Sequence, residues 1–89
     1  MSLIKLYSTT FCPYCVAAKR LLSHMKLPFE EIDLTGDWDA RAELRVRSGQ
    51  RTVPQIWIGE THIGGYTDLA ALKQRGELTA LLASEGIQA

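Results

Sequence analysis

A pair of cysteines, Cys12 and Cys15, follows directly after a β-rich stretch and limits the possible folds of this chain more than any other feature. Residues 4–8 alternate in polarity and include isoleucine and tyrosine, which predicts a strand. Pro13 then stands where a helix can begin, because proline is favoured at the first helical position. This start makes Cys12 the N-cap. The sequence therefore predicts both sulfurs at the beginning of a helix that follows a strand.

The apolar pattern extends this prediction to a second strand. Ala18, Leu22 and Met25 recur at helical spacing, and Pro28 ends the segment. Residues 29–34 alternate again and predict a strand. A helix that connects two strands in this way forms a βαβ unit, which implies that the strands pair in parallel.

A second helix is predicted from Trp38, Ala42 and Val46, which fall at steps of four residues. Gly49 is expected to end this helix, since glycine is the commonest residue just past a helix end. We expect Trp38 to pack on the helix at a partly exposed position.

The remaining elements complete a small α/β domain over residues 1–89. Residues 55–58 and 61–63 flank Gly59-Glu60 and predict an antiparallel hairpin, and leucine-rich segments on either side of Gly76 predict two short helices. This order favours a four-stranded mixed sheet flanked by helices on both faces. The side chains expected in the core are Leu6, Ile32, Ile56, Trp57 and Ile58.

Charge and hydropathy indicate where such a domain works. Ten basic and ten acidic residues cancel, so the overall charge favours neither nucleic acid nor a membrane as a partner. The N-terminus has too few apolar residues for a signal peptide, and no run approaches the roughly 20 that a membrane helix needs. We expect a cytoplasmic, monomeric protein.

Two cysteines at this spacing have three possible uses: a structural disulfide, half of a metal site, or a redox centre. A bridge between residues three apart closes too short a loop to restrict the unfolded chain much. A zinc site needs two more ligands, and the two histidines, His24 and His62, lack the usual zinc-finger spacing. We interpret His24 as a solvated or capping residue and His62 as a strand residue. The redox centre is the favoured use, with no metal expected.

The position of the cysteines on the helix assigns their roles. Backbone N–H groups of Tyr14 and Cys15 are expected to point at the Cys12 sulfur, and the helix dipole stabilises a thiolate there. Comparable sites lower a thiol pKa from about 8.5 to roughly 3.5–7.5. Cys15 lies one turn further in. We therefore predict Cys12 as the attacking thiol and Cys15 as the resolving thiol.

Three segments together carry a family resemblance: Cys-Pro-Tyr-Cys, then 51–55 (Arg-Thr-Val-Pro-Gln), then 62–69 (His-Ile-Gly-Gly-Tyr-Thr-Asp-Leu). In this order and spacing the chain resembles the dithiol glutaredoxins over nearly its whole length. The resemblance implies the thioredoxin fold. It also implies glutathione as co-substrate in the reduction of protein disulfides and of protein–glutathione mixed disulfides, with ribonucleotide reductase among the conceivable targets.

The resemblance also implies a site around Pro54. In glutaredoxins this proline is cis and faces the cysteines, and the backbone of the preceding residue, here Val53, pairs with the cysteinyl part of glutathione. From the residues alone, an ordinary proline at the first position of a strand explains the segment equally well.

For the γ-glutamyl end of glutathione, the resemblance implies the backbone N–H groups of Thr67 and Asp68 and the Asp68 carboxylate. The residues alone are also explained by a glycine turn and a helix cap. Arg51 is expected to meet the glycine carboxylate, or else to be solvated. The full set that the resemblance assigns to glutathione is Tyr14, Arg51, Thr52, Val53, Pro54, Gly65, Tyr66, Thr67 and Asp68.

One position departs from the family pattern. Thr9 stands where many glutaredoxins carry a lysine that helps to stabilise the thiolate, so the resemblance implies a less stabilised thiolate here. Thr9 also leaves room for a mycoredoxin-like or thioredoxin-like donor that uses another reductant. An iron–sulfur carrier is less favoured, because a proline directly follows the first cysteine. Lys19 and Arg20 indicate at most a mild preference for acidic partners.

Overall fold

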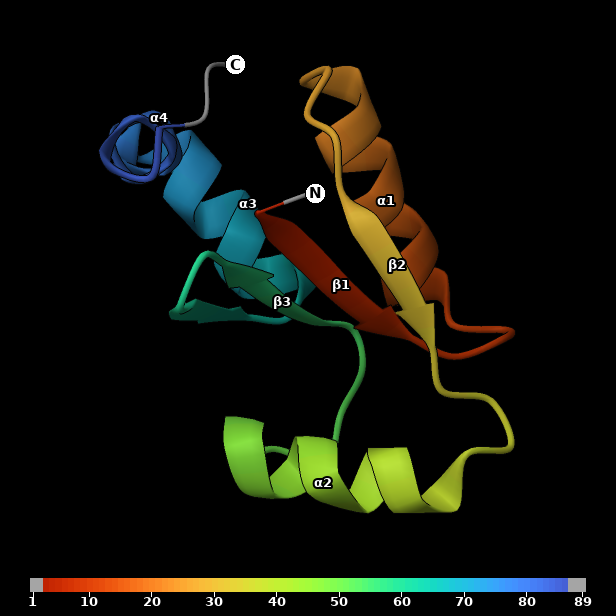
Figure 1. The fold of residues 1–89 in the computed structure, drawn as a ribbon. Coiled ribbons are helices and arrows are strands. Elements are labelled where there is room, and N and C mark those ends of the chain that lie inside the picture. The colour runs from red at the N-terminus through yellow and green to blue at the C-terminus, as the bar shows by residue number, and fades with distance from the viewer. Residues whose placement is uncertain (1–2, 87–89) are drawn as a thin grey trace.

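A four-stranded sheet with strand order β2-β1-β3-β4 forms the centre of the computed structural model, which describes residues 3–86 (Figure 1). Strands β1 and β2 pair in parallel, whereas β3 pairs antiparallel with both β1 and β4. The predicted βαβ unit, hairpin and mixed sheet are therefore confirmed. The elements are β1 (Ile4–Ser8), α1 (Pro13–His24), β2 (Glu30–Asp33), α2 (Trp38–Ser48), β3 (Gln55–Ile58), β4 (Thr61–Gly64), α3 (Tyr66–Gln74) and α4 (Glu77–Ser84).

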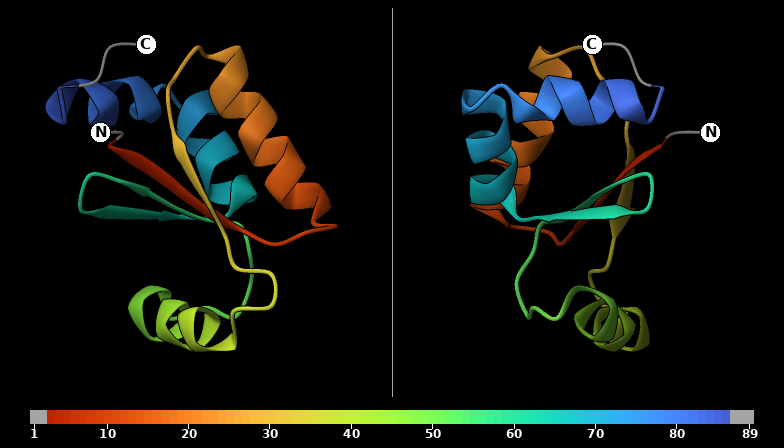
Figure 2. Two further views of the ribbon diagram at one scale, coloured as in Figure 1. Left: turned by 45° about the vertical axis from the view of Figure 1, so that its right-hand side comes forward. Right: turned by 90° about the vertical axis from the view of Figure 1, so that its left-hand side faces the viewer.

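Helices cover both faces of the sheet, as predicted. In both views of Figure 2, α1, α3 and α4 lie on one side of the strands and α2 lies alone on the other. None of the helices within residues 3–86 is long and apolar enough to cross a membrane.

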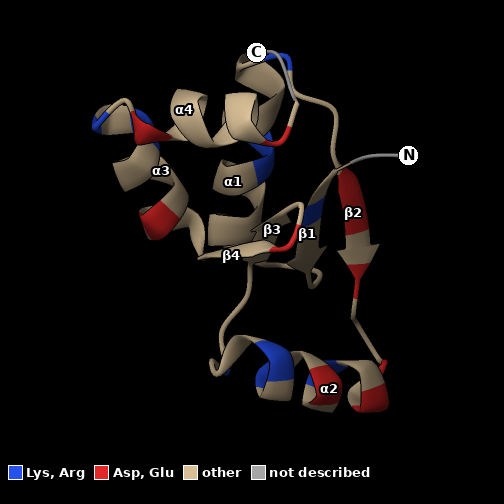
Figure 3. Cartoon of the chain, turned by 60° about the vertical axis from the view of Figure 1, so that its left-hand side comes forward, with Lys and Arg blue, Asp and Glu red and all other residues tan. Residues whose placement is uncertain are grey.

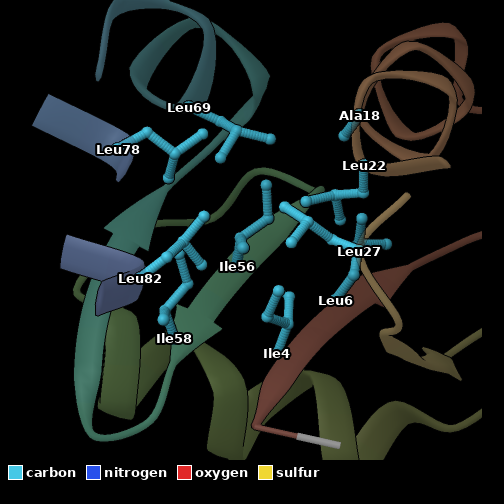
Figure 4. Close-up of a cluster of buried hydrophobic side chains, with 10 residues drawn as sticks. All are labelled: Ile4, Leu6, Ala18, Leu22, Leu27, Ile56, Ile58, Leu69, Leu78 and Leu82. Atoms are coloured by element: carbon cyan, nitrogen blue, oxygen red, sulfur yellow. The ribbon is translucent and has the colours of Figure 1, made fainter. Parts of the chain in front are cut away.

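The larger core cluster lies between the sheet and the three helices on its first face (Figure 4). Alternation along the strands sends Ile4 and Leu6 of β1, and Ile56 and Ile58 of β3, to this same face. All four are fully buried. The other buried members are Ala18, Leu22, Leu27, Leu69, Leu78 and Leu82. Packing against this cluster fixes α1, and with it the two cysteines, relative to β1.

On the opposite face, α2 attaches to the sheet through Leu44, which packs with Leu34 and Trp57. The helix spans the predicted residues, and Gly49 ends it in the left-handed conformation. The three residues whose spacing predicted the helix, Trp38, Ala42 and Val46, do not face the sheet, because all three are exposed.

A cationic side chain helps Leu44 to cover the sheet below α2. Arg47 places its guanidinium 4.9 Å from the centre of the Trp57 ring and donates a hydrogen bond of 3.1 Å to the hydroxyl of Tyr7. Together with Leu44, this long side chain makes the contact between α2 and the sheet. The outward stripe of this helix, formed by Trp38, Ala42 and Val46, therefore remains in solvent.

Candidate active site

Cys12 is the N-cap of α1, as predicted, and its side chain is partly exposed. The backbone N–H of Cys15, at the third helical position, donates to the Cys12 sulfur over 3.2 Å. The N–H of Tyr14 was also expected to donate to this sulfur. Among the described residues it makes no such bond, because the N-cap side chain reaches the N–H of the third helical residue, Cys15. The residue before Cys12, Phe11, is 99% exposed and has a positive φ of 60°.

Cys15, in contrast with Cys12, is shielded from solvent. Its side chain is buried, with 1% exposure, and this burial raises the pKa of the Cys15 thiol to about 12. The nearby Cys12 sulfur adds to this rise, whereas the backbone of Thr9 and the charge of Lys19 oppose it. Because a thiol must ionise to attack, the accessible Cys12 is the sulfur suited to react first with an external disulfide.

Opposite the cysteines, the bond between Val53 and Pro54 is cis, as the resemblance implies. The thiol of Cys12 donates to the carbonyl oxygen of Val53 across 3.6 Å, although the two residues are 41 positions apart. The turn before β3 and the start of α1 thus form one local surface.

A buried amide supports this turn. Gln55 is fully buried, and its Nε2 donates to the carbonyl of Thr52 at 2.9 Å and to Oε1 of Gln50 at 3.0 Å. Its Oε1 lies 2.6 Å from Nε2 of His62, which belongs to β4 and stacks on Trp57. The strand role predicted for His62 is confirmed.

A glycine pair lets β4 turn sharply into α3. Gly64 has φ +112°, and a side chain built there would meet the carboxylate of Asp68. Asp68 uses this space to accept the N–H of Gly65, the N-cap of α3, over 3.0 Å. The helix starts at Tyr66, which leaves the N–H groups of its first turn free of intrahelical partners.

These segments meet around a groove of about 220 Å³ beside Cys12. Its lining residues are Tyr14, Gln50, Thr52, Val53, Pro54, Gly65, Tyr66, Thr67 and Asp68. Eight of the nine residues that the resemblance assigns to glutathione are therefore gathered in one place. Arg51 is exposed and does not line the groove. Gln50 was missed, although its position just after the helix-ending Gly49 and directly before Arg51 was a usable indication.

Behind the cysteines, Lys19 is held in an ion pair. Its Nζ lies 2.9 Å from Oε2 of Glu31 on β2, and the same oxygen accepts the hydroxyl of the buried Ser8 at 2.7 Å. Figure 3 shows the acidic residues of β2 and the basic ones of α1. Lys19 is thus paired within the chain. Of the two cations that were expected to favour acidic partners, Lys19 and Arg20, this leaves Arg20.

Within residues 3–86, no group of three or more His, Cys, Asp or Glu side chains could hold a metal ion.

Comparison with known proteins adds family relationships to this geometry. A model of the Glutaredoxin family matches residues 4–63. A glutaredoxin of Pseudomonas aeruginosa is 51% identical over 81 residues, covering 91% of this chain and 96% of that protein. Glutaredoxin 3 of Escherichia coli is 46% identical over 82 residues, covering 92% and 99%. A crystal structure of a buckwheat glutaredoxin–glutathione complex is similar with a TM-score of 0.88 at 34% identity, covering 98% of this chain and 82% of that one.

Proposed function

The chain belongs to the glutaredoxin family and has its thioredoxin fold, and from this premise we propose that it is a glutathione-dependent thiol–disulfide oxidoreductase. An oxidoreductase role follows from membership of the family. The proposal adds that glutathione is the reductant, and that the substrates are protein disulfides and protein–glutathione mixed disulfides. One observation carries it most: the groove beside Cys12 gathers residues from α1, the turn before β3 and the start of α3.

In the proposed reaction, the Cys12 thiolate attacks the glutathione sulfur of a glutathionylated protein. The protein leaves as a thiolate and takes up a proton, and glutathione stays on Cys12 as a mixed disulfide. A second glutathione thiolate then attacks the sulfur of the bound glutathione, which releases oxidised glutathione and regenerates Cys12. The N–H of Cys15, 3.2 Å from the Cys12 sulfur, stabilises the thiolate at the start and end of this cycle.

The groove suits glutathione because its polar groups match the ends of that peptide. The free N–H groups at the start of α3 offer a site for the γ-glutamyl carboxylate, and the Asp68 carboxylate offers one for the amine. The backbone of Val53 is the proposed partner of the cysteinyl unit, with Tyr14 and Tyr66 flanking it; their rings lie 6.4 Å apart. Arg51 stays a proposed partner of the glycine carboxylate, reached from outside the groove.

For protein disulfides, we propose that both cysteines act in sequence. Cys12 forms the mixed disulfide with the target, and Cys15 resolves it by attacking the Cys12 sulfur. We propose that the protein works as a monomer in the cytoplasm, where glutathione is available; ribonucleotide reductase is one candidate target.

Turnover of a glutathionylated peptide, with glutathione as the only reductant, tests the function. We expect the Cys15→Ser variant to keep activity, because this reaction needs one thiol, and the Cys12→Ser variant to fall to background, because no attacking sulfur remains. The measurement is the rate of peptide release for wild type and both variants, each checked for folding by circular dichroism.

A different pattern would contradict the proposal. If the folded wild type is inactive with glutathione but is driven by a thioredoxin-type reductase or by another small thiol, glutathione is not its reductant. If Cys15→Ser is as inactive as Cys12→Ser, the one-thiol mechanism is wrong.

A further inference from the structure

The inner side of the cysteine helix carries a charged group that the proposed cycle does not use. Lys19 follows Cys15 by four residues on α1, so the two side chains lie on the same face of the helix, with Cβ atoms about 5–6 Å apart. Cys15 is buried, whereas the side chain of Lys19 is 33% exposed. Lys19 thus lies at the edge of the buried region that contains the resolving sulfur.

Two other elements fix the ammonium of Lys19. Oε2 of Glu31, on the edge strand β2, accepts both the ammonium, at 2.9 Å, and the hydroxyl of Ser8, at 2.7 Å. Ser8 is buried at the end of β1, where the loop that leads to Cys12 begins. A flexible lysine held by such an acceptor keeps its charge in one place instead of sampling solvent.

We propose that Lys19, held by the Glu31 carboxylate that Ser8 in turn fixes, is a positioning residue whose positive charge promotes ionisation of Cys15 and so sets the rate of the resolving step. The inference rests on the proposed two-cysteine route for protein disulfides. It assigns to Lys19 a role in that route and none in the one-thiol reaction.

The chemistry of the resolving step explains why a cation matters there. The Cys15 thiol gives its proton to water, and the resulting thiolate attacks the Cys12 sulfur. The Cys12–Cys15 disulfide forms while the bond from Cys12 to the target sulfur breaks, and the leaving thiolate takes up a proton. Burial raises the pKa of Cys15 and disfavours its thiolate, so any fixed cation near it raises the fraction that can react.

Other charges around Cys15 do not take over this role. Before α1, the Cys12 thiol of the reduced protein raises the pKa of Cys15 as burial does, but in the mixed disulfide this thiol no longer titrates. On β2, Glu31 and Asp33 are acidic and act on Lys19, whose own pKa they raise, with the Glu31 hydrogen bond as the main cause. Helix α3 contributes Asp68, which caps Gly65, together with Tyr66 and, in its last turn, Lys73.

A chromogenic aromatic disulfide measures the two cysteines separately and without glutathione. Cys12 attacks it and releases one coloured thiolate; Cys15 then attacks the mixed disulfide and releases a second. The Cys15→Ser variant identifies the second phase by losing it. The ratio of the second rate constant to the first therefore reports the resolving step alone, whether or not glutathione is the natural reductant.

We expect Lys19→Met to lower this ratio about threefold. Loss of a nearby cation raises a thiol pKa by about one unit, which reduces the thiolate tenfold, but a more basic thiolate is intrinsically about threefold more nucleophilic. The pH profile of the second phase should move about half a unit to higher pH. Lys19→Arg should restore both values, because the charge is kept.

Arg75→Met is the matched control, since Arg75, the C-cap of α3, forms an ion pair of the same 2.9 Å length with Glu77 of α4, at the end of α3 opposite the groove. It should change neither the ratio nor the profile. Added salt should lower the ratio in the wild type and not in Lys19→Met, because screening weakens only an existing charge interaction.

The proposal is overturned if the Lys19→Met ratio stays within about 1.5-fold of wild type, half the expected change, or if Lys19→Arg fails to restore it. A misfolded Lys19→Met would leave the arginine variant and the salt series to decide.

Discussion

At the scale of single residues, the groove depends on one glycine, Gly64. Gly64 has φ +112° and leaves the space that the Asp68 carboxylate occupies when it accepts the Gly65 N–H. A larger residue would disturb the backbone conformation and the helix cap together. The start of α3, and with it one end of the groove, therefore rests on this glycine.

We expect Gly64→Ala to lower the free energy of unfolding by about 2–3 kcal/mol, because the positive φ is strained for alanine and its Cβ meets Asp68. Gly36→Ala is the control: Gly36 has φ +79°, but an added Cβ would find no atom within 4 Å, so about 1 kcal/mol is expected from the backbone alone. Urea denaturation measures both. Equal losses would show that the contact with Asp68 contributes nothing.

At the scale of elements, the apolar spacing along α2 located the helix but did not identify its buried face. The cap at Asp37, whose Oδ1 accepts the N–H of Ala40 at 3.1 Å, and the left-handed Gly49 define its two ends locally. Its orientation depends on the sheet instead. Leu44 packs against Trp57 and Leu34, whereas the residues of the outward stripe are exposed.

Leu44→Ala should therefore lower the free energy of unfolding by about 2–4 kcal/mol, since Leu44 is the buried anchor of this helix. Val46→Ala should stay within about 0.5 kcal/mol of wild type, because this side chain is 85% exposed. Thermal or urea unfolding of the two variants compares them directly. A larger loss for Val46→Ala would mean that the stripe is buried after all.

At the scale of the whole molecule, the ion pair between Lys19 and Glu31 links α1 to the edge strand. The Lys19 ammonium, and after it the Ser8 hydroxyl, holds the pKa of Glu31 below its usual range. The Asp33 carboxylate on the same strand also has a lowered pKa, because the hydroxyl and N–H of Thr35 donate to it. Stability of the whole fold is thereby linked to pH.

The sign follows from the lowered pKa of Glu31. The folded state binds a proton there less tightly than the unfolded chain, so this stabilisation is complete above the unfolded pKa, near 4.5, and is lost as pH falls through the lower folded value. Because the Glu31 side chain is more than a third exposed, we expect a loss of under about 1 kcal/mol. Urea midpoints for wild type and Glu31→Gln, between neutral and acid pH, measure it.

The Glu31→Gln variant should show a shallower decline with acid, with the remainder due to Asp33 and other carboxylates. An identical decline in both proteins would mean that the ion pair does not contribute to stability in solution. Leu44→Ala, which removes no titrating group, should show the wild-type decline from a lower starting value.

Short-range patterns in the sequence were enough to predict the elements and the place of the cysteines at the start of a helix. Alternation along β1, Pro13 at the first position of α1 and the glycine at Gly49 act within a few residues, and the N-cap position of Cys12 follows from them. The cis bond at Pro54 and the grouping of the groove segments were predicted from family resemblance, since nothing local requires them.

The packing of the helices on the sheet determined which helix faces are buried and which charged side chains form ion pairs. The buried face of α2, the approach of the Cys12 sulfur to the Val53 carbonyl and the capture of Lys19 by Glu31 each join residues far apart in the chain. Local periodicity carries no information about the shape or charge of a distant partner. Most residues of the groove were therefore available from the family resemblance, whereas the ion pair of Lys19 beside Cys15 became visible only in the fold.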